Sequence, residues 1–110
     1  MRTAGKYQFE MRKNMVRHIV LFWLKDKSPA NIEEAAQKLR SMEGKIEGMI
    51  SLEVGVDSLH SDRSCDLCLT TVFDTMESLE RYRTHPVHLP VQKHMHQVRE
   101  SSYSADYIIV

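Results

Sequence analysis

The chain has 110 residues, 42% hydrophobic and 27% charged, which is enough for one domain with its own core. Its formal net charge is zero, so electrostatics give no reason to expect nucleic acid or an anionic membrane as a partner. No segment is as long and apolar as a membrane span, and the N-terminus lacks the apolar core of a secretion signal. We therefore expect a cytoplasmic protein.

The first 14 residues differ in charge from the rest. They hold four basic residues against one acid, Glu10, and only Tyr7 and Phe9 could anchor them to a core. We predict a flexible N-terminal tail over residues 1–14 and a single domain over residues 15–110. An extra strand, or a clasp onto a partner subunit, is the alternative for the tail.

Residues 16–24 predict a strand that is apolar on both faces. Val20 and Phe22 share one face with His18, and Leu21 and Trp23 share the other. Both faces should therefore be covered. A domain this small cannot easily sandwich a whole sheet by itself, so one face is expected to meet another subunit.

The rest of the chain alternates between helical and strand patterns. A helix should start at Ser28-Pro29, with Ser28 as N-cap, and end near Gly44. Strands from Met49 to Val56 and from Asp66 to Phe73 or Asp74 follow, separated by a polar loop from Asp57 to Ser64. A second helix should be capped by Thr75 and interrupted at His85-Pro86. A third helical segment should run to about Arg99, and Pro90 should kink it or delay its start. The last element is a strand from Tyr103 to Val110.

This order predicts an α+β, ferredoxin-like βαββαβ fold, a four-stranded antiparallel sheet with helices on one face. The helices cover only one side of such a sheet. The other side would expose Ile19, Leu21 and Trp23, and a patch of this kind usually marks an interface. We therefore predict a homodimer packed sheet against sheet.

Cys65 and Cys68 form a C-x2-C spacing, which could indicate half a zinc site or a redox pair. The second cysteine falls on a predicted strand, where residues three apart point to opposite faces and lie roughly 10 Å apart, too far for a disulfide. We expect one cysteine to pack inward and the other to lie on the far face. His94 and His96 lie roughly 200° apart around a helix and cannot chelate together, so we expect no metal.

The segment from Tyr82 to His88 carries a phenol and two imidazoles beside a proline-defined corner. His18 and Asp106 lie on apolar strand faces, and in this fold they could share one cavity with Tyr82 and His88. Such a set suits acid–base catalysis on an enolisable carbonyl without a metal or cofactor. We predict His88 as the base and Asp106 as the residue that orients it. Tyr82 would donate a hydrogen bond to the carbonyl oxygen, and His18 would be a secondary polar contact. Alternatively, each of these side chains is structural; His85 in particular could cap the helix or support a ligand.

Four segments together resemble one family: Val16–Phe22, Ser51–Gly55, the Tyr82–His88 step and Ala105–Tyr107. The family is that of the stress-responsive dimeric α/β barrel (Dabb) proteins, and the resemblance covers about residues 15–110. It implies a ferredoxin-like monomer and a barrel-shaped homodimer. One plant branch, similar to olivetolic acid cyclase, cyclises a polyketide; its catalytic Tyr and His match Tyr82 and His88, and its supporting His and Asp match His18 and Asp106.

Three functions follow as expectations. The first is a homodimeric barrel protein that binds a small apolar or aromatic ligand, with a metal-free cyclase or isomerase using His88 and Tyr82 as its enzymatic form. The second is a purely structural stress protein. The third, by fold analogy alone, is cofactor-free oxidation of aromatic substrates. A cavity of a few hundred Å³ that touches both His88 and Tyr82 would favour ligand chemistry, whereas a filled interior would favour the structural role.

Overall fold

The computed structural model describes residues 14–109, so the predicted tail lies almost entirely outside the described residues. The described elements are β1 (Val16–Leu24), α2 (Pro29–Arg40), β2 (Met49–Val56), β3 (Leu67–Phe73), α3 (Met76–Arg83), α4 (His88–Val98) and β4 (Arg99–Ile108). No helix within residues 14–109 is long and apolar enough to cross a membrane. The expected cytoplasmic location stays a prediction.

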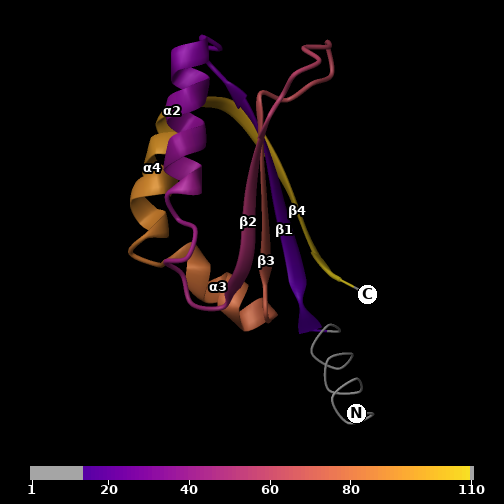
Figure 1. Cartoon of the computed structure of the whole chain (residues 1–110), viewed down its shortest axis with the longest axis vertical. Coiled ribbons are helices and arrows are strands. Elements are labelled where there is room, and N and C mark those ends of the chain that lie inside the picture. The colour runs from indigo at the N-terminus through magenta and orange to yellow at the C-terminus, as the bar shows by residue number, and fades with distance from the viewer. Residues whose placement is uncertain (1–13, 110) are drawn as a thin grey trace.

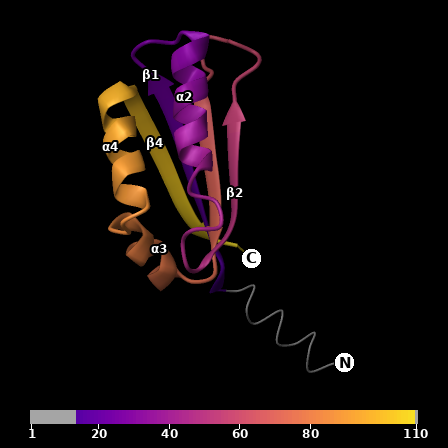
Figure 2. The ribbon, with the colours of Figure 1, turned by 60° about the vertical axis from the view of Figure 1, so that its left-hand side comes forward.

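The four strands form one antiparallel sheet in the order β2-β3-β1-β4. Figures 1 and 2 show α2 and α4 side by side on one face of this sheet, with α3 at its lower end. The opposite face carries no helix among the described residues. The predicted ferredoxin-like fold, with helices on one face, is confirmed.

Local sequence explains where the helices begin. The Ser28 side chain accepts a hydrogen bond from the Asn31 amide, and Pro29 occupies the first turn of α2. Thr75 caps α3 in the same way, by accepting from the Ser78 amide. Pro90 lies in the first turn of α4, where its missing N–H costs no helical hydrogen bond, so the helix begins at His88.

Two boundaries differ from the prediction by more than two residues. Helix α2 ends at Arg40, and a turn through Gly44, whose φ is +76°, follows it. Strand β4 begins at Arg99 rather than Tyr103, because the Arg99 amide still bonds to the Met95 carbonyl while its backbone already pairs with Leu24. Helix therefore passes into strand without a loop, and the polar run before Tyr103 hides this start.

The core lies between the helices and one face of the sheet. Val16, Phe22 and Leu24 of β1 are buried there, as are Leu67, Leu69 and Phe73 of β3. The helices contribute Ala35, Ala36, Leu39, Leu79, Tyr82, Val91 and Met95. The face of β1 that carries Val20 and Phe22 is thus the helix-covered face, as the alternation predicted.

The open face of the sheet is also rich in apolar and aromatic groups. Register places Ile19, Leu21 and Trp23 beside Val72 and Tyr103 on this side. The Trp23 and Tyr103 rings meet edge to face at 5.7 Å, and Tyr103 is 67% exposed. Nothing among the described residues covers this face.

Both cysteines are free and partly exposed. Cys65 precedes β3, and Cys68 lies on the open face beside Thr70. Cys68 lies on the far face, as expected for one of the two cysteines, because the alternation of β3 turns Leu67 and Leu69 inward. Cys65 precedes the strand and is only partly buried, so the inward packing expected for the other cysteine is incomplete.

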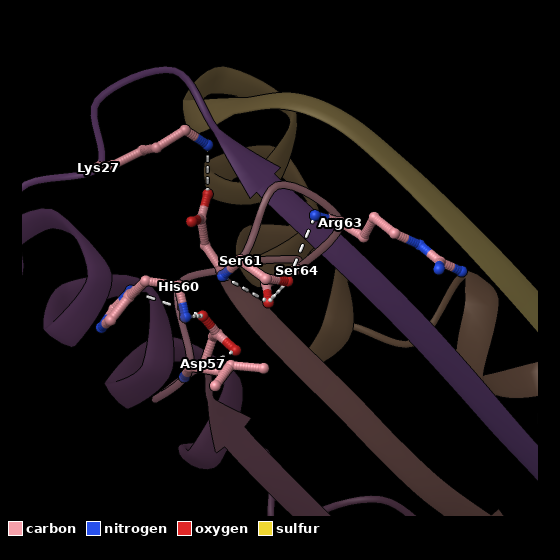
Figure 3. A network of polar contacts seen from close by, with 8 residues as sticks. Lys27, Asp57, His60, Ser61, Arg63 and Ser64 are labelled. Atoms are coloured by element: carbon pink, nitrogen blue, oxygen red, sulfur yellow. Dashed lines mark hydrogen bonds and ion pairs between the residues drawn. The ribbon is translucent and has the colours of Figure 1, made fainter.

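The loop between β2 and β3 is held by its own polar contacts, shown in Figure 3. Asp57 accepts from the His60 amide at 2.7 Å, and the hydroxyls of Ser61 and Ser64 lie 2.8 Å apart. Lys27 reaches the Asp66 carboxylate at 2.7 Å, and the same carboxylate accepts from the Leu24 amide. The bonds to Asp66 tie the end of β1 to the start of β3.

Candidate active site

A cavity of about 440 Å³ lies between the helix-covered face of the sheet and helices α2, α3 and α4. Its apolar lining includes Val20, Phe22, Leu39, Leu69, Val91 and Met95. Its polar lining includes His18, Tyr82, His88, His96, Arg99 and Asp106. The structure therefore brings His18, Tyr82, His88 and Asp106 together in one cavity; their roles stay predictions.

Helix α3 is anchored where it leaves the sheet, and this anchoring places Tyr82. Ser78 is 1% exposed and donates its hydroxyl proton to the Asp74 carboxylate. Gly48, with a φ of +83°, packs so closely here that a Cβ would collide with Ser78. The Asp74 amide donates to the Gly48 carbonyl at 2.9 Å. The start of the helix is thus locked to the turn before β2.

Tyr82 is 2% exposed and is surrounded by aromatic rings. Phe73 lies 5.1 Å from its ring centre, and the His88 imidazole stacks on it at 4.0 Å. Among residues 14–109, its hydroxyl reaches only the Met42 sulfur, 3.9 Å away, which is a weak acceptor. Burial raises the pKa of Tyr82. The group therefore stays a neutral O–H with capacity to donate to an oxygen in the cavity.

One ring nitrogen of His88 has no hydrogen-bond partner among the residues that the structure describes. Its Nδ1 lies 3.3 Å from the Arg83 carbonyl oxygen, and because a carbonyl only accepts, Nδ1 carries the proton. Nε2 is then an acceptor. Burial lowers the pKa of His88, while hydrogen bonds to the Arg83 and Tyr82 backbone oppose that change. The neutral imidazole is therefore favoured, which is the form that a general base requires.

Asp106 pairs with His18 and not, as expected, with His88. The two residues face each other across β1 and β4, and Asp106 Oδ1 lies 2.5 Å from His18 Nδ1. Direct cross-strand register brings their side chains together on one face. The His18 ring meets Tyr82 edge-on at 5.9 Å. Tyr82 thus lies between two imidazoles, one held by a carboxylate and one by a backbone carbonyl.

His85 is not among the residues that line the cavity. Its Nδ1 accepts from the Val87 amide at 3.0 Å, and its Nε2 lies 3.0 Å from Glu47 Oε2. The side chain therefore stabilises the corner between α3 and α4, which is the capping role that the sequence left open. The sequence analysis also offered His85 as a ligand contact, but the helix break at Pro86 turns the His85 ring toward Glu47 and away from the cavity.

The comparisons with known proteins agree with this fold. The model of the stress responsive A/B barrel domain (Dabb) family matches residues 16–109. The chain belongs to the Dabb family. Among curated proteins, none matches the chain.

Solved structures related to this Dabb protein include a dimeric protein of unknown function from Bacteroides fragilis. It is 28% identical, with a TM-score of 0.74, and the match covers 86% of this chain and 95% of that one. A hydroxynitrile lyase from Passiflora edulis is 18% identical, with a TM-score of 0.77 and coverage of 89% and 95%. SnoaB, a cofactor-independent oxygenase from Streptomyces nogalater, is 14% identical, with a TM-score of 0.69 and coverage of 86% and 91%. The last two likenesses show the fold alone.

Several cavity residues of this Dabb protein were missed from the sequence: Gln92, His96, Arg99, Ser102 and Ser104. Helical spacing from His88 would have found the first two, since residues four and eight positions later share its side of α4. Alternation along β4 would have found both serines, which share a face with Asp106. His94 faces the other way, with its Nε2 3.9 Å from Glu34 of α2.

No group of three or more His, Cys, Asp or Glu side chains within residues 14–109 is arranged to hold a metal ion. The polar residues of the cavity instead offer proton donors and acceptors. Two imidazoles, a neutral phenol and a carboxylate can take up, hold and return protons.

Proposed function

We propose that this Dabb protein is an acid–base enzyme that acts on a small carbonyl compound in the cavity between its sheet and its helices. One observation carries the proposal: Tyr82 lies against a neutral His88 in that cavity, and its buried hydroxyl meets only a thioether among the described residues. A buried hydroxyl usually has a better partner, so a ligand oxygen is a natural one.

The proposed step is removal of a proton from the carbon next to a carbonyl. His88 Nε2 takes the proton, and the electrons of the C–H bond form the enolate while the carbonyl π electrons move to oxygen. The Tyr82 hydroxyl donates a hydrogen bond to that oxygen as its charge develops. The imidazolium of His88 then returns the proton to the enolate carbon, as in an isomerase. Alternatively, the enolate carbon attacks a second carbonyl, as in a cyclase; the π electrons of that carbonyl move to its oxygen, and the resulting alkoxide takes the proton from His88.

His18 and Asp106 form the second proton-handling pair. The carboxylate on Nδ1 orients the His18 ring, as in other His–carboxylate pairs. Because His18 lies edge-on to Tyr82, this pair places a second imidazole close to the phenol. The apolar lining on the far side of these groups suits a small apolar or aromatic body.

The cavity also argues against a purely structural role, since a protein interior that serves packing alone is normally filled.

The proposed assembly is a homodimer through the open face of the sheet. Its support is the apolar surface of Leu21 and Trp23 together with the dimeric state of the structural relative from Bacteroides fragilis.

The test follows exchange of α-protons of phenylacetone for deuterium in D₂O by NMR, after a thermal-shift screen with aromatic and β-keto acids. We expect exchange above the uncatalysed rate, reduced about 100-fold or more in His88→Gln and in Tyr82→Phe. His60→Asn changes a histidine in the loop of Figure 3 and should leave the rate unchanged. No exchange with the wild type, or full exchange in both site variants, would contradict the proposal.

A further inference from the structure

The charged groups of the cavity are paired, with one exception. Glu80 Oε2 lies 3.6 Å from Arg83 Nη1, and Asp106 is held by His18. Arg99 also lines the cavity, but no carboxylate within residues 14–109 lies within ion-pair distance of it. The cavity therefore contains a guanidinium whose charge the described part of the chain does not neutralise.

Backbone geometry directs this guanidinium onto the cavity side of the sheet. Arg99 is the first residue of β4, and its Nη1 donates to the hydroxyl of Ser102. Ser102 pairs with Phe22 and shares the helix-covered face. Arg99 is partly buried, so its charge is less screened than that of a surface arginine. Only this one of its five N–H donors has a partner among the described residues.

Arg99 lies far along β4 from the proton-handling groups. Ser102 and Asp106 are four residues apart on this strand, which separates them by roughly 13 Å. Apolar side chains such as Val20, Phe22 and Met95 line the cavity as well. A molecule that contacts both ends needs an anionic group at one end and a carbonyl at the other, with an apolar body between them.

We propose that Arg99 binds a carboxylate of the substrate, so that the cavity selects carbonyl compounds that also carry an acid group. A carboxylate matches the planar fork of a guanidinium with two parallel hydrogen bonds. The assignment of the carbonyl end rests on the proposed function. The anion-binding role of Arg99 rests only on its missing partner and its position.

The test measures binding of octanoate and of octanamide, two probes with the same chain and a different headgroup, by isothermal titration calorimetry at low salt. The wild type should bind octanoate about tenfold more tightly than octanamide, and added KCl should narrow this difference. Arg99→Gln should bind both probes equally, with octanamide affinity unchanged as proof of a folded cavity. Arg99→Lys should keep part of the preference, because it keeps the charge but loses the fork.

Arg63→Gln is the matched control, since Arg63 lies in the loop of Figure 3 and not in the cavity. Equal affinities in the wild type, no binding of either probe, or an unchanged preference in Arg99→Gln would overturn the role of Arg99. The outcome is separate from that of the proton-exchange test. Exchange without a preference for octanoate contradicts Arg99 alone, and a preference lost in Arg99→Gln without exchange contradicts the acid–base proposal alone.

Discussion

The two faces of the sheet are built from equally apolar residues of β1 but are covered differently. Val16, Phe22 and Leu24 are buried under the helices, whereas Leu21 and Trp23 of the other face remain partly exposed. The helix-covered face also changes character at β4, where Ser102, Ser104 and Asp106 replace apolar residues and line the cavity. Apolar residues that alternate along a strand therefore indicate that this face of the sheet must be covered. Polar residues on the same face mark the part that the helices leave open as a cavity.

The largest expected effect comes from breaking the helix-covered face. Phe73→Ala removes a fully buried ring that packs against Tyr82, and should lower the free energy of unfolding by about 3–5 kcal/mol. Urea unfolding at a fixed protein concentration measures this change. Leu59→Ala, at a side chain that is 80% exposed, is the control and should change stability by no more than about 0.5 kcal/mol. A loss below about 1 kcal/mol for Phe73→Ala would mean that this face is not the core.

Breaking the open face should affect assembly more than folding. Leu21→Glu places a charge in the centre of the proposed dimer interface and should weaken self-association about 100-fold, or about 2.7 kcal/mol. Sedimentation of the wild type and the variant at micromolar concentration measures it. Lys38→Glu, on the exposed side of α2, introduces the same charge and should remain dimeric. A monomeric wild type, or a dimeric Leu21→Glu variant, would contradict the sheet-to-sheet assembly.

The smallest expected effect is on the pH dependence of the free energy of unfolding, and it concerns His88, one of the two imidazoles at Tyr82. The pKa of His88 is lower in the folded protein than its ordinary value of 6.5, so the unfolded chain binds more protons as pH falls below 6.5. His88 therefore contributes stability above pH 6.5 that is lost as pH falls through its folded pKa. Urea unfolding between pH 5 and pH 8 should show a weaker pH dependence in His88→Gln than in the wild type. His60→Asn serves as the exposed control, and an unchanged dependence in His88→Gln would show that this ring is not desolvated.

Much of the fold could be read from local signals. Alternation marked β1 and β2 within their observed bounds, and Ser28 and Thr75 marked the starts of α2 and α3 because cap geometry needs a short side-chain acceptor. The start of β4 was hidden, since a strand that follows a helix without a loop and begins with polar residues has no local signature. Its position depends on pairing with β1, a contact between residues far apart in sequence.

Four of the five residues predicted for the candidate site line the cavity, but the pairing predicted among them differs from the structure. Tyr82, His88, His18 and Asp106 meet in one cavity, yet the carboxylate belongs to His18. The proximity of His85 to the other histidines in sequence was misleading, because the break at Pro86 directs its ring to Glu47. His85 and His88 are only three residues apart, yet His85 stabilises the corner between two helices and His88 lines the cavity.

The amino-acid order alone determined the bounds of β1 and β2, the starts of α2 and α3, the fold class and the residues able to handle protons. These depend on periodicity, capping and side-chain chemistry within a few positions. Tertiary structure alone decided which imidazole receives the carboxylate. It also decided that, within the part of the chain that the structure describes, the Tyr82 hydroxyl meets only a thioether and Arg99 has no counter-charge. Those features depend on strand register and on the shape of a cavity lined by six separate elements, β1, α2, β3, α3, α4 and β4. Contacts of that kind join residues that are far apart in the sequence, and no local sequence pattern encodes them.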